Sequence, residues 1–169
     1  LFTVAAIMGH DPKVADQSYL SVTDEMRSNA VFVGEALPDT YRTAKGPTPP
    51  PLERTPTGRC KDSLHGDRAP KDGTHCIYFL SCFSCRSYAV VGTSEDLHRL
   101  FSCYWFLEAE SRNTRSREWA EYFTLIRTQI DLFTMDKFDE ELVTQSREAA
   151  RSKPLKFWSR YRISGGALA

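Results

Sequence analysis

The sequence contains no long hydrophobic run and no excess of charge of either sign. No apolar stretch approaches the roughly 18 residues that a membrane-spanning helix needs, so we expect no membrane partner. The apolar residues 1–8 are too short for a signal peptide and have no basic residue before them. With 22 basic and 22 acidic residues among 169, net charge neither favours nor excludes a nucleic-acid partner, because charge can still gather locally.

The sequence also lacks an internal repeat and an initiator methionine. It starts at Leu1, which predicts a piece of a longer protein. Five prolines lie in residues 45–58, where they exclude a regular helix and favour an extended linker. All five cysteines follow this linker. We therefore expect five segments, namely residues 1–44, the linker 45–58, a cysteine-rich module 59–92, a helical extension 93–163 and a flexible tail 164–169.

Helical patterns precede the linker. Asp11 followed by Pro12 is typical of a helix start, because Asp11 can accept first-turn amides and Pro12 has no amide to leave unpaired. This helix would end near Leu20, and a second would begin near Ser21. The apolar stripe of the second helix consists of Met26, Ala30, Val33 and Leu37.

Helical patterns also dominate after the linker. Capping residues and an acidic first turn predict a helix over residues 93–110, a second helix has a stripe from Trp119 to Phe133, and a third spans residues 138–152. Before them, residues 75–82 and 87–92 predict two short strands. The expected fold is therefore mainly α, with a small β-hairpin module followed by a three-helix extension.

Four of the five cysteines have a spacing that suits a metal. Intervals of 15, 5 and 2 residues separate Cys60, Cys76, Cys82 and Cys85. The Cys-x-x-Cys turn can present two thiolates to one ion, and four thiolates form the usual structural zinc site. A short segment with little core also needs such a cross-link to fold. An odd number of cysteines without a secretion signal favours a reducing compartment, so we predict a cytoplasmic protein that holds structural zinc.

Two alternatives stay open for the cysteine cluster. His65 or His75 could replace one cysteine as a ligand, or the thiols could be ordinary reduced cysteines. The fifth cysteine, Cys103, falls at the edge of an amphipathic stripe, which favours a packing role.

Gly9 and His10 lie directly before the first predicted helix start. The free amides of a helix N-terminus suit a phosphate, and His10 can donate a hydrogen bond to it. Tyr19 follows nine residues later, about 13 Å along the axis of a continuous helix. A phenol with a pKa of about 10 attacks phosphorus only where cations stabilise the transferring group. Taken singly, each residue has a plainer interpretation, His10 as a cap and Tyr19 as packing.

Taken together, "VAAIMGH" and a Tyr nine residues after the His resemble the C-terminal catalytic motif of the tyrosine recombinases, the phage-integrase family. The resemblance covers residues 1–37, and Met8 stands where the family usually has Leu. It implies that His10 binds the scissile phosphate of double-stranded DNA and that Tyr19 is the nucleophile. The expected 3′-phosphotyrosyl chemistry needs no cofactor. The resemblance also implies contacts with other recombinase protomers, and a cysteine-rich extension is compatible with integrase-like proteins of mobile elements.

The chain departs from the family in a way that decides its expected activity. The family's catalytic arginines, lysine and His-x-x-Arg element lie upstream of the Gly-His, but only nine residues precede His10 and none is basic. We therefore expect the C-terminal end of a DNA recombinase that is inactive by itself. The alternative is a non-enzymatic zinc-binding helical module that binds DNA or a protein partner.

The stretch "RSKPLKFWSRYR" near the C-terminus contains no acidic residue. Its cations could contact DNA phosphates. The candidate DNA-binding residues are Lys153, Lys156, Arg160 and Arg162. The pattern supports at least as well an alternative in which the aromatic side chains dock on the helices and the charges lie in solvent.

Overall fold

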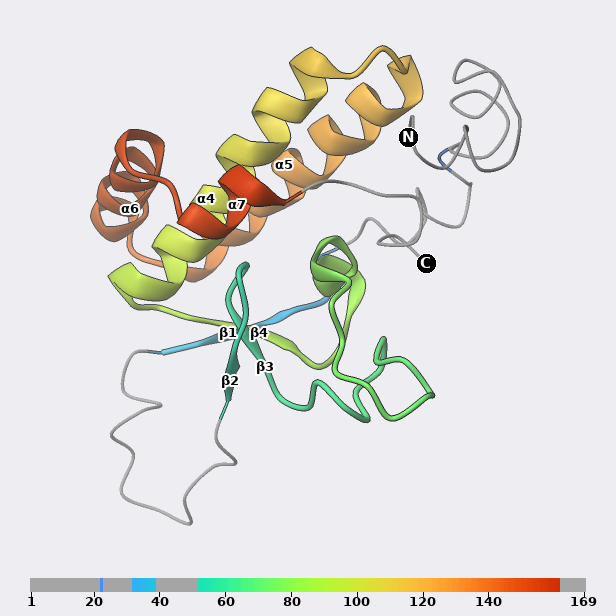
Figure 1. Ribbon diagram of the computed structural model, residues 1–169. Coiled ribbons are helices and arrows are strands. Elements are labelled where there is room, and N and C mark those ends of the chain that lie inside the picture. The colour runs from blue at the N-terminus through green and yellow to red at the C-terminus, as the bar shows by residue number, and fades with distance from the viewer. Residues whose placement is uncertain (1–21, 23–31, 39–51, 162–169) are drawn as a thin grey trace.

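A computed structural model describes residue 22 and residues 32–38 and 52–161, and it shows a small sheet packed against a group of helices (Figure 1). The predicted helix from Asp11 to Leu20 and the tail 164–169 lie outside these described residues. Within the described part, the chain is mainly helical with one four-stranded sheet. None of the helices described there is long and apolar enough to cross a membrane.

The sheet combines strands from both sides of the expected linker. Its order is β1 (Glu35–Leu37), β4 (Tyr88–Val91), β3 (Arg59–Cys60) and β2 (Glu53–Arg54). β1 runs parallel to β4, and the other neighbours are antiparallel. The first and third expected segments therefore meet in one sheet, and residues expected in the linker form an edge strand.

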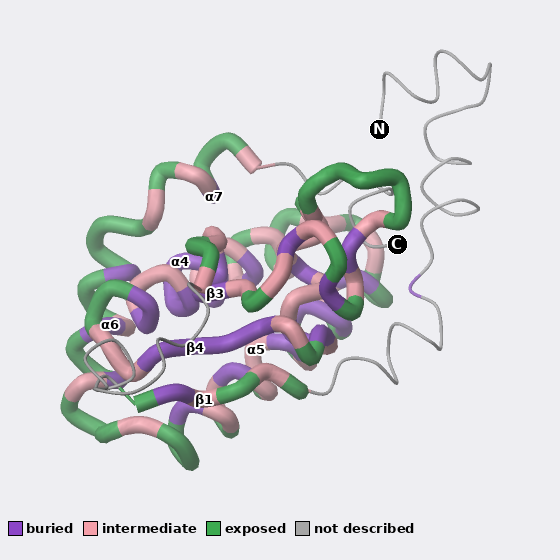
Figure 2. The backbone as a smooth tube through the Cα atoms, turned by 90° about the horizontal axis from the view of Figure 1, so that it is seen from below, coloured by how far each residue is buried: buried purple, intermediate pink, exposed green. Residues whose placement is uncertain are grey.

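The strand β1 corrects the prediction of a helix that continues to Leu37. The apolar period of that stretch suits a helix, but β4 is buried along its whole length (Figure 2). A buried strand needs partners for its amides and carbonyls on both sides. β1 supplies one side and β3 the other, so pairing between distant segments outweighs the local helical pattern.

The predicted hairpin of residues 75–82 and 87–92 is wrong in its first strand. β4 forms as expected, but the 3-10 helix η2 (Phe79–Ser84) replaces the end of the other strand. Leu80 and Phe83 are both buried in η2, because residues three apart share a face of a 3-10 helix. The short apolar run therefore buries its side chains as a 3-10 helix and not as a paired strand.

The three predicted helices of the extension are present, and a fourth follows them. They are α4 (Ser94–Asn113), α5 (Arg117–Lys137), α6 (Glu140–Ser152) and the short α7 (Lys156–Arg160). The side chains of Thr93, Ser116 and Asp139 cap the first three by accepting backbone amides. The cap of α4 confirms the start predicted at residue 93, and α6 begins close to the start predicted near residue 138.

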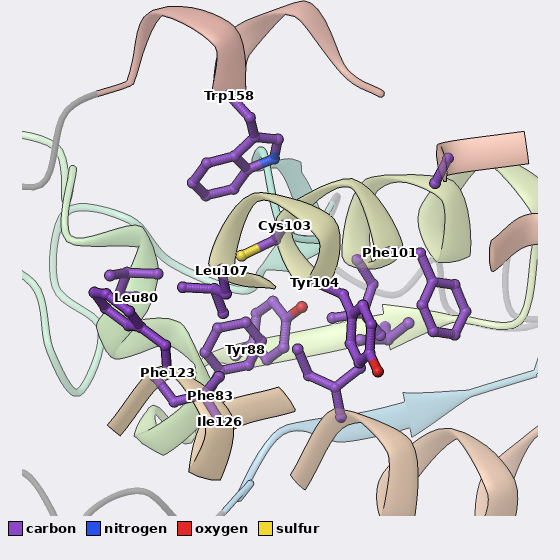
Figure 3. Close-up of a cluster of buried hydrophobic side chains, with 14 of the residues drawn as sticks. Leu80, Phe83, Tyr88, Phe101, Cys103, Tyr104, Leu107, Phe123, Ile126 and Trp158 are labelled. Carbon is purple, nitrogen blue, oxygen red and sulfur yellow. The ribbon is translucent and has the colours of Figure 1, made fainter. Parts of the chain in front are cut away.

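The core lies between α4, α5 and the sheet. The predicted stripes are buried: Leu97, Leu100, Phe101 and Leu107 of α4 are fully enclosed, as are Ile126 and Ile130 of α5. Figure 3 shows Cys103 and Tyr88 inside this cluster. Cys103 is 0% exposed, which confirms its packing role. The stacked rings of Phe32 and Phe133, with centroids 3.9 Å apart, join the β1 end of the chain to α5.

A buried ion pair joins the sheet to the helices. Arg59 Nε of β3 donates to both carboxylate oxygens of Asp96 in the first turn of α4, at 2.8 and 2.9 Å. Both side chains are almost fully enclosed. Arg99 of α4 also donates to the Thr55 carbonyl oxygen at 3.2 Å. These contacts hold the cysteine-bearing strand against the start of α4.

Candidate metal centre

The four predicted cysteine ligands line one cavity. Cys60 comes from β3, Cys76 from the loop before η2, Cys82 from η2 itself, and Cys85 follows η2 directly. The cavity has a volume of about 30 Å³, and Asp62, Tyr78 and Tyr88 are among its other lining residues. The fold thus brings together four thiols that span 26 positions of the sequence.

Backbone hydrogen bonds hold the segments that present these thiols. The Cys85 amide donates to the Cys82 carbonyl oxygen at 3.0 Å, which closes the Cys-x-x-Cys turn. The Cys76 amide donates to the Ser63 carbonyl oxygen at 2.8 Å, and the Lys61 amide donates to Ser87 at 2.8 Å. Cys60 and Cys76 therefore sit on backbone that is tied to another segment, whereas Cys82 and Cys85 share one closed turn.

Without a cation, the surroundings of the cluster keep its thiols protonated. Burial raises the pKa of the Cys60 thiol, and it raises that of Cys82 far above its usual range. Neighbouring thiols raise both pKa values further, because several thiolates close together repel one another. A divalent cation among them reverses this balance, since it stabilises each thiolate directly.

Neither predicted alternative histidine is among the residues that line the cavity. His75 Nδ1 lies 2.5 Å from Ser63 Oγ, which in turn donates to Glu53 Oε2 at 2.5 Å. His65 is exposed and pairs with Asp62. The cavity is therefore lined by all four cysteines and by neither histidine.

The four cysteine side chains do not form a complete metal site in this structure. Among the described residues there is no group of three or more His, Cys, Asp or Glu that could already hold a metal ion. Ligation therefore requires the thiols to come closer together than they lie in this structure.

Sequence patterns did not reveal the polar contacts around Cys76. Glu53 of β2, Ser63 and His75 form a continuous chain of hydrogen bonds from the edge strand to the loop that ends at Cys76. Their separations of 10 and 12 residues match no local motif. Only the fold of the loop reveals them.

The predicted DNA-binding residues divide into described and undescribed positions. Lys153 follows α6 directly, and Lys156 and Arg160 lie on α7; all three are exposed. The aromatic residues of α7 pack inward, with Trp158 stacked on Phe106 at 4.9 Å between centroids. The catalytic candidates His10 and Tyr19, and the basic Arg162, lie outside the described residues.

Comparisons of the chain with protein-family models, with curated proteins and with solved structures find no match. The functional argument therefore rests on the residues and the geometry of this chain.

Proposed function

We propose that the cysteine-rich region is a structural zinc module whose ligands are Cys60, Cys76, Cys82 and Cys85. The observation that carries this proposal is that all four line one cavity. A cavity of about 30 Å³ has room for one ion. Four protein thiolates complete the tetrahedral shell of Zn²⁺ and leave no open position for catalysis.

The proposed ion would cross-link parts of the chain that have little regular structure of their own. Residues 61–78 contain no helix or strand, and most of their side chains are exposed or half-buried. Zinc binding free energy becomes folding free energy in such a segment. The metal would thus hold β3, the Cys76 loop and η2 together beneath the helices.

Metal analysis tests the zinc module. Protein purified without chelator should contain close to one equivalent of zinc, and Cys82→Ser with Cys85→Ser should remove it. Cys103→Ala is the matched control, because it removes a buried thiol outside the proposed ligand set and should leave the metal in place. A folded protein with no metal and four freely reactive thiols would contradict the proposal.

We further propose that this module is the C-terminal extension of a tyrosine recombinase that cuts and rejoins double-stranded DNA. Support comes from the sequence "IMGHDPKVADQSYL", which contains His10 and Tyr19 at the family's spacing. The Tyr19 oxygen would attack the scissile phosphorus and release a 5′-hydroxyl, while His10 donates a hydrogen bond to a non-bridging oxygen. Attack by another 5′-hydroxyl on the phosphotyrosine would reverse the step and free Tyr19.

The Tyr19→Phe variant tests the recombinase proposal in a protein extended upstream to include the missing cations. The variant should fold and bind DNA, but it should form no covalent adduct on a nicked suicide substrate that traps the parent protein. His10→Ala should slow adduct formation without abolishing it. An adduct formed by Tyr19→Phe would place the nucleophile elsewhere.

A binding module without catalysis remains the second candidate because of one observation. Lys156 and Arg160 are exposed on α7, while the aromatic residues between them pack inward. Such cations can contact phosphates without any chemistry. Duplex binding that survives Tyr19→Phe but falls with Lys156→Gln and Arg160→Gln, in a protein that never forms an adduct, would favour this candidate.

A further inference from the structure

We propose that the outer face of α5 binds a second copy of this chain, with the two α5 helices antiparallel about a two-fold axis near Thr128. The buried side of α5 belongs to the core that it shares with α4 and the sheet, so the opposite side of the helix is free for a partner. The inference depends on neither the proposed zinc ion nor Tyr19, and it gives α5 a role that neither proposed function includes.

Six exposed residues share the outer side of α5. They follow one another at intervals of 4, 3, 4, 4 and 3, which keeps them on one side of a helix with 3.6 residues per turn. The first and the last are 18 positions apart, about 27 Å along the axis. This outer face consists of Arg117, Glu121, Thr124, Thr128, Leu132 and Met135.

The middle of the outer face can be buried without leaving a polar side chain unpaired. Thr124 Oγ1 donates to the Ala120 carbonyl oxygen at 2.8 Å, and Thr128 Oγ1 donates to the Thr124 carbonyl oxygen at 3.0 Å. Both hydroxyls are therefore satisfied within the helix. Next to them, Leu132 is 58% exposed and Met135 is 77% exposed, so a partner that covers this face buries apolar surface.

The charged residues in the middle of α5 face α4 and not the outer side. Among residues 122–135 these are Arg127 and Asp131. The Tyr104 hydroxyl of α4 lies 3.3 Å from Asp131 Oδ2 and 3.3 Å from an Arg127 nitrogen. The guanidinium groups of Arg127 and Arg147 lie over the Tyr104 ring, 4.7 and 4.9 Å from its centroid. The middle of the outer face is therefore uncharged, as the centre of a protein interface usually is.

The two ends of the outer face have opposite net charge. Residues 112–121 contain three arginines and two glutamates, whereas residues 136–141 contain four carboxylates and one lysine. All of these charged side chains are exposed. Arg115 has no ion pair with a described residue. Arg112 and Arg117 pair with glutamates of their own helices at the surface, where such pairs contribute little.

This order of charges suits a second copy in the antiparallel orientation. A two-fold contact needs a surface that is complementary to itself. With Thr128 at the axis, Thr124 of one protomer lies beside Leu132 of its partner, and the arginine end of each lies beside the acidic end of the other. A parallel pair would place like charges together at both ends. The antiparallel orientation also brings each helix N-terminus near the partner's C-terminus, which the helix dipoles favour.

Sedimentation equilibrium of the 169-residue chain under reducing conditions tests the contact. One helix pair is a small interface, so we expect a dissociation constant in the micromolar range. The constant should rise with salt concentration, because the charged ends are exposed and therefore screened.

A substitution at the axis has the largest expected effect on the dimer. Thr128→Lys places two ammonium groups against each other and should raise the dissociation constant at least about tenfold. Thr128→Ala is the matched control, since it adds no charge and should dimerise like wild type. Position 128 is exposed in the single chain, so both variants should keep their helix content, which circular dichroism checks.

Charge exchange at the ends tests the orientation. Arg115→Glu/Arg117→Glu makes both ends acidic, and Glu140→Lys/Glu141→Lys makes both ends basic. Each variant by itself should dimerise more weakly than wild type. An equimolar mixture of the two should form a heterodimer, because opposite charges then meet again at both ends.

Three results would overturn the inference. A chain that is monomeric at every concentration, even at low salt, would assign the outer face to a different partner. A dimer that Thr128→Lys does not weaken would have its contact elsewhere on the molecule. End variants that dimerise as well as wild type would show that the charges do not orient the pair.

Discussion

Residues 93–161 and residues 52–92 reach a buried core by different routes. The first region folds into three long helices whose caps and apolar stripes lie close together in sequence. The second has two-residue strands, a 3-10 helix and a long irregular loop, and its order depends on partners far along the chain. Local interactions thus dominate one region and long-range contacts the other.

The contrast shows where each region is vulnerable. A helix loses one capping contact or one packed side chain and keeps the rest of its hydrogen bonds. The cysteine-rich region is held by a few specific contacts, including the Arg59–Asp96 pair and the Tyr88 hydroxyl, which donates to the Thr57 carbonyl oxygen at 2.5 Å. Removing one of them should therefore affect a whole segment.

The largest expected effect follows from the removal of the proposed zinc ion. Chelation at neutral pH should unfold residues 59–87 locally and leave α4, α5 and α6 helical, because α4 also packs directly against α5 and α6. Hydrogen exchange should show loss of amide protection at Lys61, Cys76 and Cys85, whereas the centres of α4 and α5 keep theirs. Equal loss of protection in both regions would mean that they fold as one unit and would remove the contrast.

A smaller but still large effect is expected from breaking the buried ion pair at the junction. Asp96→Asn leaves the Arg59 guanidinium enclosed without its carboxylate, which should cost about 3–5 kcal/mol of unfolding free energy. Urea denaturation measures this loss. The double variant Arg59→Met/Asp96→Leu should recover much of it, since no charge is then left buried. A loss below about 1 kcal/mol for Asp96→Asn would show that the pair is solvated.

The smallest effect concerns Glu95, at the surface of the same junction. The Arg99 hydrogen bond and the charges of Arg54 and Arg99 hold the pKa of Glu95 below its ordinary value of 4.5. A lowered pKa stabilises the fold above pH 4.5, and that contribution disappears as the pH falls through the folded-state pKa.

Partial exposure limits the size of the Glu95 contribution. Glu95→Gln should cost about 0.5 kcal/mol at pH 7 and less as the pH falls below 4.5, as measured by thermal unfolding across pH. Glu148→Gln, an exposed change on α6, is the control for the loss of one surface charge. A cost that does not decrease with falling pH would assign the effect to packing instead of charge.

The accuracy of sequence-based prediction follows the same division between regions. Thr93, Ser116 and Asp139 mark the starts of α4, α5 and α6, and the buried stripes of those helices repeat at helical spacing, so short windows of sequence suffice. The stretch ending at Leu37 has a helical period as well, yet it forms β1 because β4 needs a partner there. No local pattern contains that requirement.

The cysteine site has one part that the sequence predicts and one part that only the fold reveals. The Cys82-x-x-Cys85 turn is visible in the sequence and is present in the fold. The convergence of Cys60 and Cys76 on the same cavity depends on β3 pairing with β4 and on the loop held by Ser63.

The sequence by itself determined the three helices α4, α5 and α6, their buried stripes and the packing role of Cys103. These depend on interactions between residues a few positions apart, whose geometry a helix defines in advance. The tertiary structure decided the strand at residues 35–37, the coil of η2, the shared cavity of the four cysteines and the grouping of Arg127 and Arg147 against one tyrosine. Each of these features depends on which distant segments meet. Burial of the whole core determines those contacts, and no short window of the sequence contains enough information to predict them.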